Sequence, residues 1–217
     1  RISDPSMYDA FTGADDVAGA YKAGHYICEM LGEEGGEVGL LEGLLAQSTG
    51  VDRKAGFEQG IADCPYPVEI VANTGAEWRS DLALNATVNM LSAHPNIKAI
   101  FASNDQMAVG MVNGVYAAGK SPDDLILVGY DGILDAVNAV FDGDLDAFVA
   151  LPNREEAEMS VRVATALVLN PDYQYSREIV FPGPLVTHDY VEGLTDQTIY
   201  EFAAFRFPLR GVTDKGY

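Results

Sequence analysis

The chain has 217 residues, of which 48% are hydrophobic, so it is long enough to form one large domain or two small ones around a buried core. It carries 33 acidic side chains and 13 basic ones, which give a formal net charge of −20. Nucleic acids and anionic membrane surfaces attract basic patches, so this balance argues against both as partners. No apolar run in the sequence approaches the roughly 20 residues of a membrane-spanning helix.

Short apolar segments alternate along the chain with segments of helical periodicity. The predicted strands, in chain order, cover residues 7–12, 37–42, 68–72, 97–102, 125–129, 147–150, 177–181 and 185–187. The predicted helices cover residues 15–31, 51–64, 80–93, 105–118, 134–141 and 153–169. This alternation predicts an α/β fold with a doubly wound parallel sheet and right-handed crossovers.

Residues 97–110 combine an apolar strand, a polar turn and the start of a helix. Apart from Lys98, the run 97–102 is apolar and lacks polar alternation, which is typical of a parallel strand covered on both faces. Ser103, Asn104 and Asp105 follow it, between the carboxyl end of a strand and a helix N-terminus, where open α/β sheets bind ligands. We expect Asp105 mainly to cap the helix and Asn104 to contact a ligand.

Polar loops follow several other predicted strands, and the carboxyl ends of parallel strands converge on one edge of a sheet. An aromatic ring stacks on the apolar C–H face of a sugar, while Asn and Asp side chains form paired hydrogen bonds with its hydroxyl groups. These residue types favour a site for a small polyhydroxy ligand. The candidate contacts are Gln47, Trp78, Asn104, Tyr130 and Asp131. A partly buried core position is an equally good interpretation of Trp78.

The sequence contains no pattern typical of catalysis or of a metal or cofactor site. The glycine-rich segment 32–36 lacks the Gly-Lys-Ser/Thr of a phosphate loop and precedes a strand instead of following one. His25, His94 and His188 have no partner at metal-ligand spacing. There is no Gly-x-Ser-x-Gly nucleophile motif and no pair of carboxylates at two strand ends. We therefore predict a binding protein with no catalytic residues, no metal and no cofactor.

Cys28 and Cys64 both fall in predicted helices and form no CxxC motif. Because free cysteine is often a small core residue, two buried thiols are favoured over a disulfide. The cysteines alone thus leave the redox compartment open. The sequence begins at Arg1 without a methionine, so we expect that an upstream segment has been removed.

Three motifs occur in order along the chain. They are Arg-Lys-Ala-Gly-Phe at 53–57, Ala-Ile-Phe-Ala-Ser-Asn-Asp-Gln-Met-Ala at 99–108 and Val-Gly-Tyr-Asp-Gly at 128–132. They resemble Arg-x-x-Gly-Phe, Ala-Ile-Phe-Ala-x-Asn-Asp-x-Met-Ala and Val-Gly-Phe-Asp-Gly of the periplasmic sugar-binding protein family, in its ribose/galactose-type branch. The resemblance extends over residues 12–191.

This resemblance implies the type I periplasmic-binding-protein fold, in which a hinge joins two lobes and sugar binds in the cleft between them. It implies sugar contacts at Trp78, Asn104 and Asp131. A sugar-binding arginine typical of the branch lies two residues before the Arg53 position, on Val51, so we expect that contact to be lost. A less hydroxylated ligand, a polyol or a furanosyl molecule is then compatible with the site.

By the same alignment, residues 1–14 end the first lobe and reach the hinge, and residues 15–150 form the carboxyl-terminal ligand-binding lobe. Residues 151–194 form the hinge and the helix and strands that return to the first lobe, and residues 195–217 form a tail. Most of the first lobe would be missing from this sequence. The apolar surface left without its partner lobe would favour dimerisation.

The function implied by the resemblance is capture of a sugar or sugar-like molecule for an ABC-type importer, with the transporter permease as partner. The implied location is the periplasm or the cell exterior. The alternative is a ligand-sensing domain of a LacI-type transcriptional regulator or of a membrane receptor, which is expected to share the same lobes.

Overall fold

The structure is a computed structural model that describes residues 4–170, 172 and 174–192, so the predicted tail 195–217 lies outside the described residues. The strands are β1 (Phe11–Ala14), β2 (Gly36–Glu42), β3 (Val68–Gly75), β4 (Ile97–Ala102), β5 (Ile126–Asp131), β6 (Ala147–Ala150), β7 (Glu178–Phe181) and β8 (Leu185–Thr187). The α-helices are α1 (Asp16–Leu31), α2 (Ser48–Ala62), α3 (Ser80–Ala93), α4 (Asp105–Ala117), α5 (Leu134–Asp142), α6 (Asn153–Leu169) and α7 (His188–Val191).

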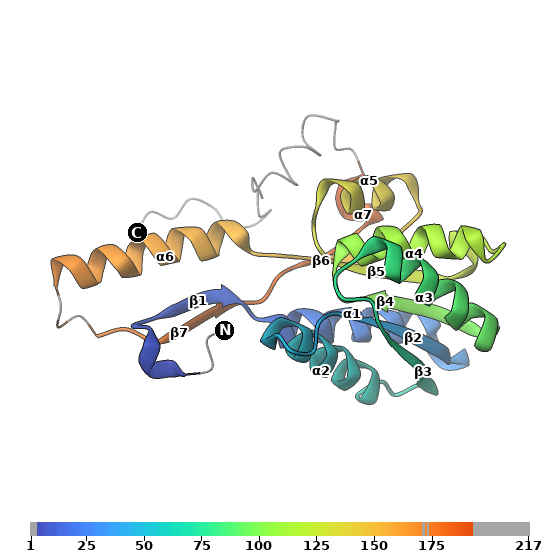
Figure 1. Cartoon of the computed structure of the whole chain (residues 1–217), viewed down its shortest axis with the longest axis horizontal. Coiled ribbons are helices and arrows are strands. Elements are labelled where there is room, and N and C mark those ends of the chain that lie inside the picture. Colours follow the sequence, from blue (N-terminus) through green and yellow to red (C-terminus); the bar gives the residue numbers. More distant parts are fainter. Residues whose placement is uncertain (1–3, 171, 173, 193–217) are drawn as a thin grey trace.

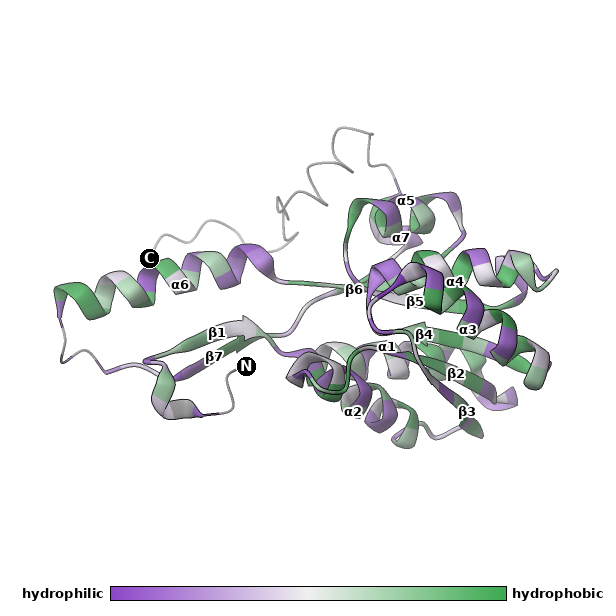
Figure 2. Cartoon of the chain, in the orientation of Figure 1, coloured by the Kyte–Doolittle hydropathy of each residue, from purple (hydrophilic) through white to green (hydrophobic). Residues whose placement is uncertain are grey.

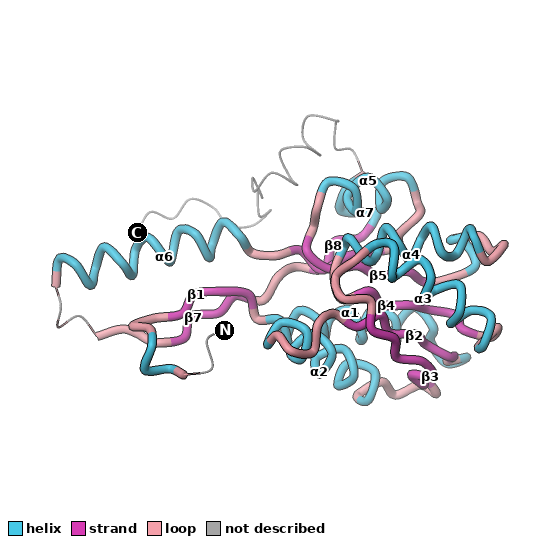
Figure 3. Tube along the Cα trace, viewed as in Figure 1, coloured by secondary structure: helices cyan, strands magenta, loops and turns pink. Residues whose placement is uncertain are grey.

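Six strands form the main sheet in the order β3-β2-β4-β5-β6-β8. Every neighbouring pair is parallel except β6 and β8, which are antiparallel. Helices α1 and α2 cover one face of this sheet, and α3, α4 and α5 cover the other (Figures 1 and 3). Strand β4 lies inside the sheet with core on both faces, which explains its apolar sequence after the exposed Lys98. The predicted doubly wound α/β fold is confirmed.

Helices α1 and α2 pack unusually closely because glycines line their contact. A Cβ atom at Gly24, Gly56 or Gly60 would overlap backbone atoms of the facing helix. Near the carboxyl ends of the two helices, Cys28 and Cys64 form a disulfide with a Cα–Cα distance of 5.7 Å. The prediction of two free thiols was therefore wrong. The sequence pattern placed each cysteine in a helix, but it could not show that the two helices are neighbours.

Some element boundaries also differ from the sequence prediction. The predicted strand 7–12 is replaced by a 3₁₀ turn, Pro5–Met7, followed by β1. Asp4 Oδ1 accepts a hydrogen bond from Ser6 N at 2.9 Å, which caps this turn and moves the strand start toward the carboxyl end. Helix α2 begins before the predicted position and β3 extends further than predicted, so both polar loops are shorter than expected.

A smaller unit projects from the main sheet (Figure 1, left). It consists of the parallel pair β1 and β7 with α6 packed against both strands. The carboxyl-terminal half of α6 is rich in apolar residues (Figure 2), and Val161, Val168 and Leu169 are 67%, 80% and 79% exposed. Of the helices that the structure describes, none is long and apolar enough to cross a membrane.

Candidate functional site

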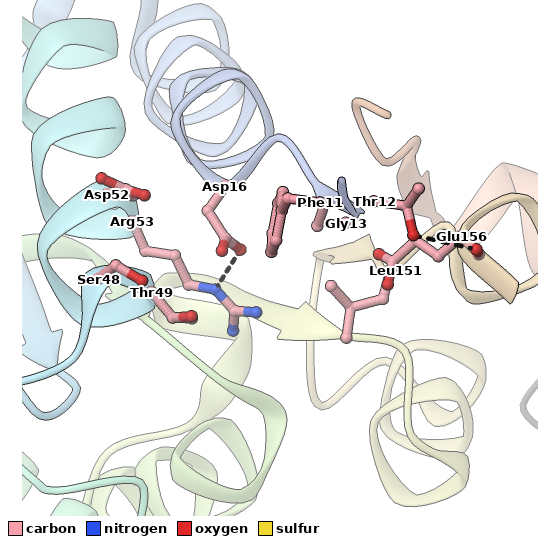
Figure 4. A pocket seen from close by; sticks show the side chains of 11 residues that line it. Phe11, Thr12, Gly13, Asp16, Ser48, Thr49, Asp52, Arg53, Leu151 and Glu156 are labelled. Atoms are coloured by element: carbon pink, nitrogen blue, oxygen red, sulfur yellow. Dashed lines mark hydrogen bonds and ion pairs between the residues drawn. The ribbon is translucent and has the colours of Figure 1, made fainter. Parts of the chain in front are cut away.

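The guanidinium group of Arg53 connects the polar groups at the carboxyl ends of β4 and β5. Its Nε atom donates to Asp16 Oδ1 at 2.9 Å, as Figure 4 shows. Its Nη1 atom donates to Asp131 Oδ1 at 2.8 Å and to the backbone oxygen of Ser103 at 2.7 Å. Desolvation lowers the pKa of Arg53, but the charges of Asp131 and Asp16 outweigh it and raise the pKa above its usual value. The guanidinium therefore remains charged although it is buried.

Arg53 is the site residue that the sequence analysis missed. Val51, on which the family arginine was placed, is 47% exposed, whereas Arg53 is buried in the site. The loss of the family contact at Val51 stays a prediction, and Arg53 is a second arginine, which the structure places beside Asp131. The spacing of Arg53, Phe57 and Ile61, each four residues apart, puts all three on the buried face of α2. An arginine on a core-facing stripe requires a carboxylate partner, and that signal could have identified it.

The ring of Tyr130 lies beneath the guanidinium, with Arg53 Cζ 3.7 Å from the ring centroid. This is a cation–π contact on a side that water does not reach, since Tyr130 is 1% exposed. Burial raises the pKa of the Tyr130 hydroxyl far above its usual range. Tyr130 therefore packs against the guanidinium of Arg53 and does not face the solvent.

Trp78 and Gln47 lie together at the rim of the site. Trp78 Nε1 donates to Gln47 Oε1 at 2.9 Å, and Arg53 Cζ lies 5.8 Å from the Trp78 ring centroid. Trp78 and the preceding Glu77 have positive φ angles of 65° and 50°. A Cβ atom at Gly43 would overlap the indole ring, so this glycine makes room for Trp78. The strained loop thereby holds a half-buried aromatic ring close to the guanidinium.

The structure gives Asn104 the helix-cap role that was expected for Asp105. Asn104 is the N-cap of α4, and its Oδ1 atom accepts from Met107 N at 2.9 Å. Asp105 instead points away from the helix start, and its Oδ2 atom accepts from the backbone of Gly132 and Ile133. The prediction that Asp105 caps the helix was wrong. Asn and Asp are similarly good caps, so sequence alone could not choose between adjacent residues.

Asp131 ends β5 beside this turn. Its φ angle of 123° is outside the range usual for a residue with a side chain. Burial raises the pKa of Asp131, and the adjacent Arg53 guanidinium opposes that rise. The site thus presents a carboxylate and a guanidinium side by side, with Trp78 near the guanidinium.

An open pocket of about 290 Å³ lies between these groups and the smaller β1–β7 unit. It is lined by Phe11, Thr12, Gly13, Ala14, Asp16, Ser48, Thr49, Asp52, Arg53, Leu151 and Glu156 (Figure 4). None of the five residues predicted as contacts is among these lining residues. Asp131 and Tyr130 contact Arg53, which lines the pocket. Gln47 precedes another lining residue, Ser48, in the sequence. Whether the five contact a ligand stays a prediction.

One group of possible metal ligands occurs among the described residues. His188, Asp189 and Glu192 place their ligand atoms within 4.8 Å of one another, although the sequence analysis gave His188 no partner. All three side chains are exposed, and none lines the pocket at Arg53. Exposed acidic side chains of this kind commonly carry no ion, so we assign no metal to them.

Residues 1–171 match the periplasmic binding protein domain family. The chain belongs to this family. The membership confirms the resemblance seen in the three sequence motifs, and it agrees with the doubly wound lobe described above.

Among curated members of the periplasmic binding protein family, the ribose import binding protein of Escherichia coli is 39% identical over 142 residues, which are 65% of this chain and 46% of that protein. The D-allose-binding periplasmic protein of the same organism is 35% identical over 172 residues, or 79% of this chain and 53% of that protein. The chain thus spans about half the length of the curated relatives it matches.

The fold of the chain also matches that of a solved solute-binding protein. The periplasmic solute-binding protein of an ABC transporter from Actinobacillus succinogenes, with bound D-allose, superposes with a TM-score of 0.79 at 28% identity. The match covers 87% of this chain and 66% of that one.

Proposed function

We propose that this chain is the ligand-binding part of a solute-binding protein that captures a sugar or sugar-like molecule for an ABC-type importer. The observation that carries the proposal is the set of polar groups around Arg53. The contacts of Arg53 described above use Nε and Nη1, and we assign Nη2 to the ligand. Asn104 uses its Oδ1 atom to cap α4 and keeps its amide nitrogen as a donor, while Asp131 supplies a carboxylate acceptor. Hydroxyl groups, which both donate and accept, match this mixture.

Trp78 completes the chemistry because a sugar has one apolar C–H face. Its ring lies beside Arg53, so a ligand bound to the guanidinium could stack on it. Gln47 would fix the orientation of the indole through its hydrogen bond to Nε1. The named sugars of the family relatives support a ligand of this class.

The site is one wall of a cleft in this proposal. Residues 15–150 form the ligand-binding lobe, and residues 1–14 and 151–194 belong to the hinge and to a second lobe whose remainder packs on α6. Two observations support this: the chain spans about half of its curated relatives, and α6 exposes a row of aliphatic side chains. Without that lobe, the same face of α6 would favour dimerisation.

The proposed partner is the membrane permease of the importer, and the proposed location is the periplasm or the cell exterior. The two curated relatives are sugar-binding proteins, one of them named for ribose import, which favours this function over a transcriptional regulator or receptor. Their names are also consistent with a protein that performs no reaction. The disulfide between Cys28 and Cys64 fits an oxidising compartment.

The test is ligand binding by the longer protein that contains this lobe, measured by calorimetry and thermal shift against D-ribose, D-allose and xylitol. We expect at least one of these compounds to bind and Arg53→Met to abolish the binding. Lys54→Met is the matched control, because it removes the neighbouring positive charge, which pairs with Glu42 outside the site. Binding that survives Arg53→Met as well as it survives Lys54→Met would refute the proposed site.

A further inference from the structure

Asp105 is fully buried, and its carboxyl group accepts hydrogen bonds from the loop that follows β5. Its Oδ2 atom accepts from Gly132 N at 2.5 Å and from Ile133 N at 3.0 Å. In the other direction, the backbone of Asp105 lowers the pKa of the Asp131 carboxyl group. The start of α4 and the end of β5 are therefore joined by the hydrogen bonds that Asp105 accepts.

The loop that Asp105 holds has an unusual backbone. Asp131 and Gly132 have consecutive positive φ angles of 123° and 87°. Glycine adopts such angles readily, but for Asp131 they are costly and persist only where the surroundings enforce them. The two hydrogen bonds to Asp105 are the contacts that immediately follow Asp131, so they are placed to enforce this conformation.

The conformation of Asp131 determines where its carboxylate points. In the structure it meets Arg53 Nη1 at 2.8 Å. If the loop relaxed to ordinary angles, Asp131 would leave Arg53, and the guanidinium would retain only Asp16 and the Ser103 carbonyl among the hydrogen-bond partners described above. The geometry of the proposed ligand site thus depends on a residue that cannot itself reach the ligand.

We propose that Asp105 is a positioning residue of the site, whose carboxyl group holds residues 131–133 in the strained conformation that directs Asp131 at Arg53. The inference rests on the proposed function only for the use of the site, because the positioning itself is a property of the unliganded protein. The role requires an acceptor at Oδ2 and does not require a negative charge.

A second observation agrees with a neutral group at this position. The Oδ1 atom of Asp105 is buried and makes no hydrogen bond to the described part of the chain. It lies against Gly129, where an added Cβ atom would overlap it. Burial, with a smaller contribution from the Asp131 charge, raises the pKa of Asp105 to about 8. Asparagine, which has the same shape and keeps one acceptor, should therefore replace Asp105 without loss of position.

The test uses nuclear magnetic resonance of the unliganded chain, comparing wild type with Asp105→Asn and Asp105→Ala. Asp105→Ala should speed amide exchange of Gly132 and Ile133 about tenfold or more, as expected for loss of a strong acceptor, and should speed solvent exchange of the Arg53 Nε–H proton. Asp105→Asn should keep both signals at wild-type rates. Asp81→Ala is the matched control, because Asp81 occupies the first turn of the neighbouring α3 but is exposed.

Unchanged Gly132 and Arg53 signals in Asp105→Ala would overturn the proposal, and so would an Asp105→Asn protein that behaves like Asp105→Ala. If Asp105→Ala does not fold, the wild-type chain decides by the scalar coupling across the hydrogen bond between Gly132 nitrogen and the Asp105 carboxyl carbon. A detected coupling supports the proposal, and its absence overturns it. These measurements need no sugar, so a failure of the ligand-binding test would leave their outcome unaffected.

Discussion

Arg53 Nη1 and Asp131 Oδ1 lie 2.8 Å apart, although 78 residues separate them in the sequence. One partner comes from a helix on one face of the sheet, and the other from the end of a central strand. Because both side chains are largely buried, each is costly without the other. This pair therefore couples the packing of α2 on the sheet to the shape of the site.

Replacing Arg53 with methionine should destabilise the chain by about 3–5 kcal/mol, since Asp16 and Asp131 would then be buried without their cation. Urea unfolding followed by circular dichroism measures the change. The control Lys54→Met should cost less, because it leaves one buried carboxylate, Glu42, without its cation instead of two. Equal losses in the two variants would contradict the central role of Arg53.

Two substitutions at Asn104 should separate its structural role from its proposed ligand contact. Asn104→Asp keeps the helix cap but loses the amide donor, so we expect stability near wild type and weaker sugar binding. Asn104→Ala loses both and should also lower stability by about 1 kcal/mol. Thermal unfolding and calorimetry on the same samples distinguish these outcomes, and wild-type affinity in Asn104→Asp would remove Asn104 from the site.

The only tryptophan of the chain is Trp78, so its fluorescence reports on the rim of the site alone. We expect a bound sugar to change this emission, and Trp78→Phe to bind more tightly than Trp78→Ala by about 0.5–1.5 kcal/mol of stacking energy. Gln47→Ala should shift the emission of the free protein, because it removes the hydrogen-bond partner of the indole. Emission that is insensitive to a sugar shown to bind by calorimetry would place Trp78 outside the contact surface.

Removal of the disulfide should weaken the helix pair that carries Asp16 and Arg53. The two cysteines are 36 residues apart, and closing a loop of this size typically stabilises a fold by about 2–4 kcal/mol. The double variant Cys28→Ser/Cys64→Ser should therefore unfold at lower urea concentration, and reducing agent should do the same to wild type but not to the variant. Identical unfolding of oxidised and reduced wild type would show that the cross-link contributes nothing.

The carboxyl group of Asp105 should make stability fall as pH rises. Burial raises its folded-state pKa from 3.8 to about 8, so the folded protein holds the proton more tightly than the unfolded chain. This contribution is complete below about pH 4 and is lost between that pH and about pH 8. Because Asp105→Asn cannot titrate, its free energy of unfolding should exceed that of wild type increasingly over this range. Parallel pH profiles would show that Asp105 is ionised throughout.

Periodicity and motifs were enough to predict the fold, because each buried strand and each amphipathic helix shows its pattern locally. The motif at 99–108 also predicted the polar turn between the end of β4 and the start of α4. What local patterns could not supply was contact between distant elements. The motif that contains Arg53 did not show that Asp131 and Asp16 surround it in space. The helical pattern around Cys28 likewise did not show that Cys64 lies beside it. Asn104 and Asp105 are adjacent and chemically similar. Asn104 caps α4, whereas Asp105 accepts hydrogen bonds from the loop that follows β5.

The pairing of β1 with β7 has a consequence for how the chain folds. A hydrogen bond from the Tyr175 hydroxyl to the Asp9 carbonyl joins residues 166 positions apart at the end of this small unit, whereas helices α2 to α5 pack on strands close to them in sequence. Closing so long a loop costs more chain entropy, and few local contacts compensate for it. The β1–β7 pair should therefore be the last part of the structure to assemble and the first to open, and hydrogen exchange should find its amides the least protected of all the strands described.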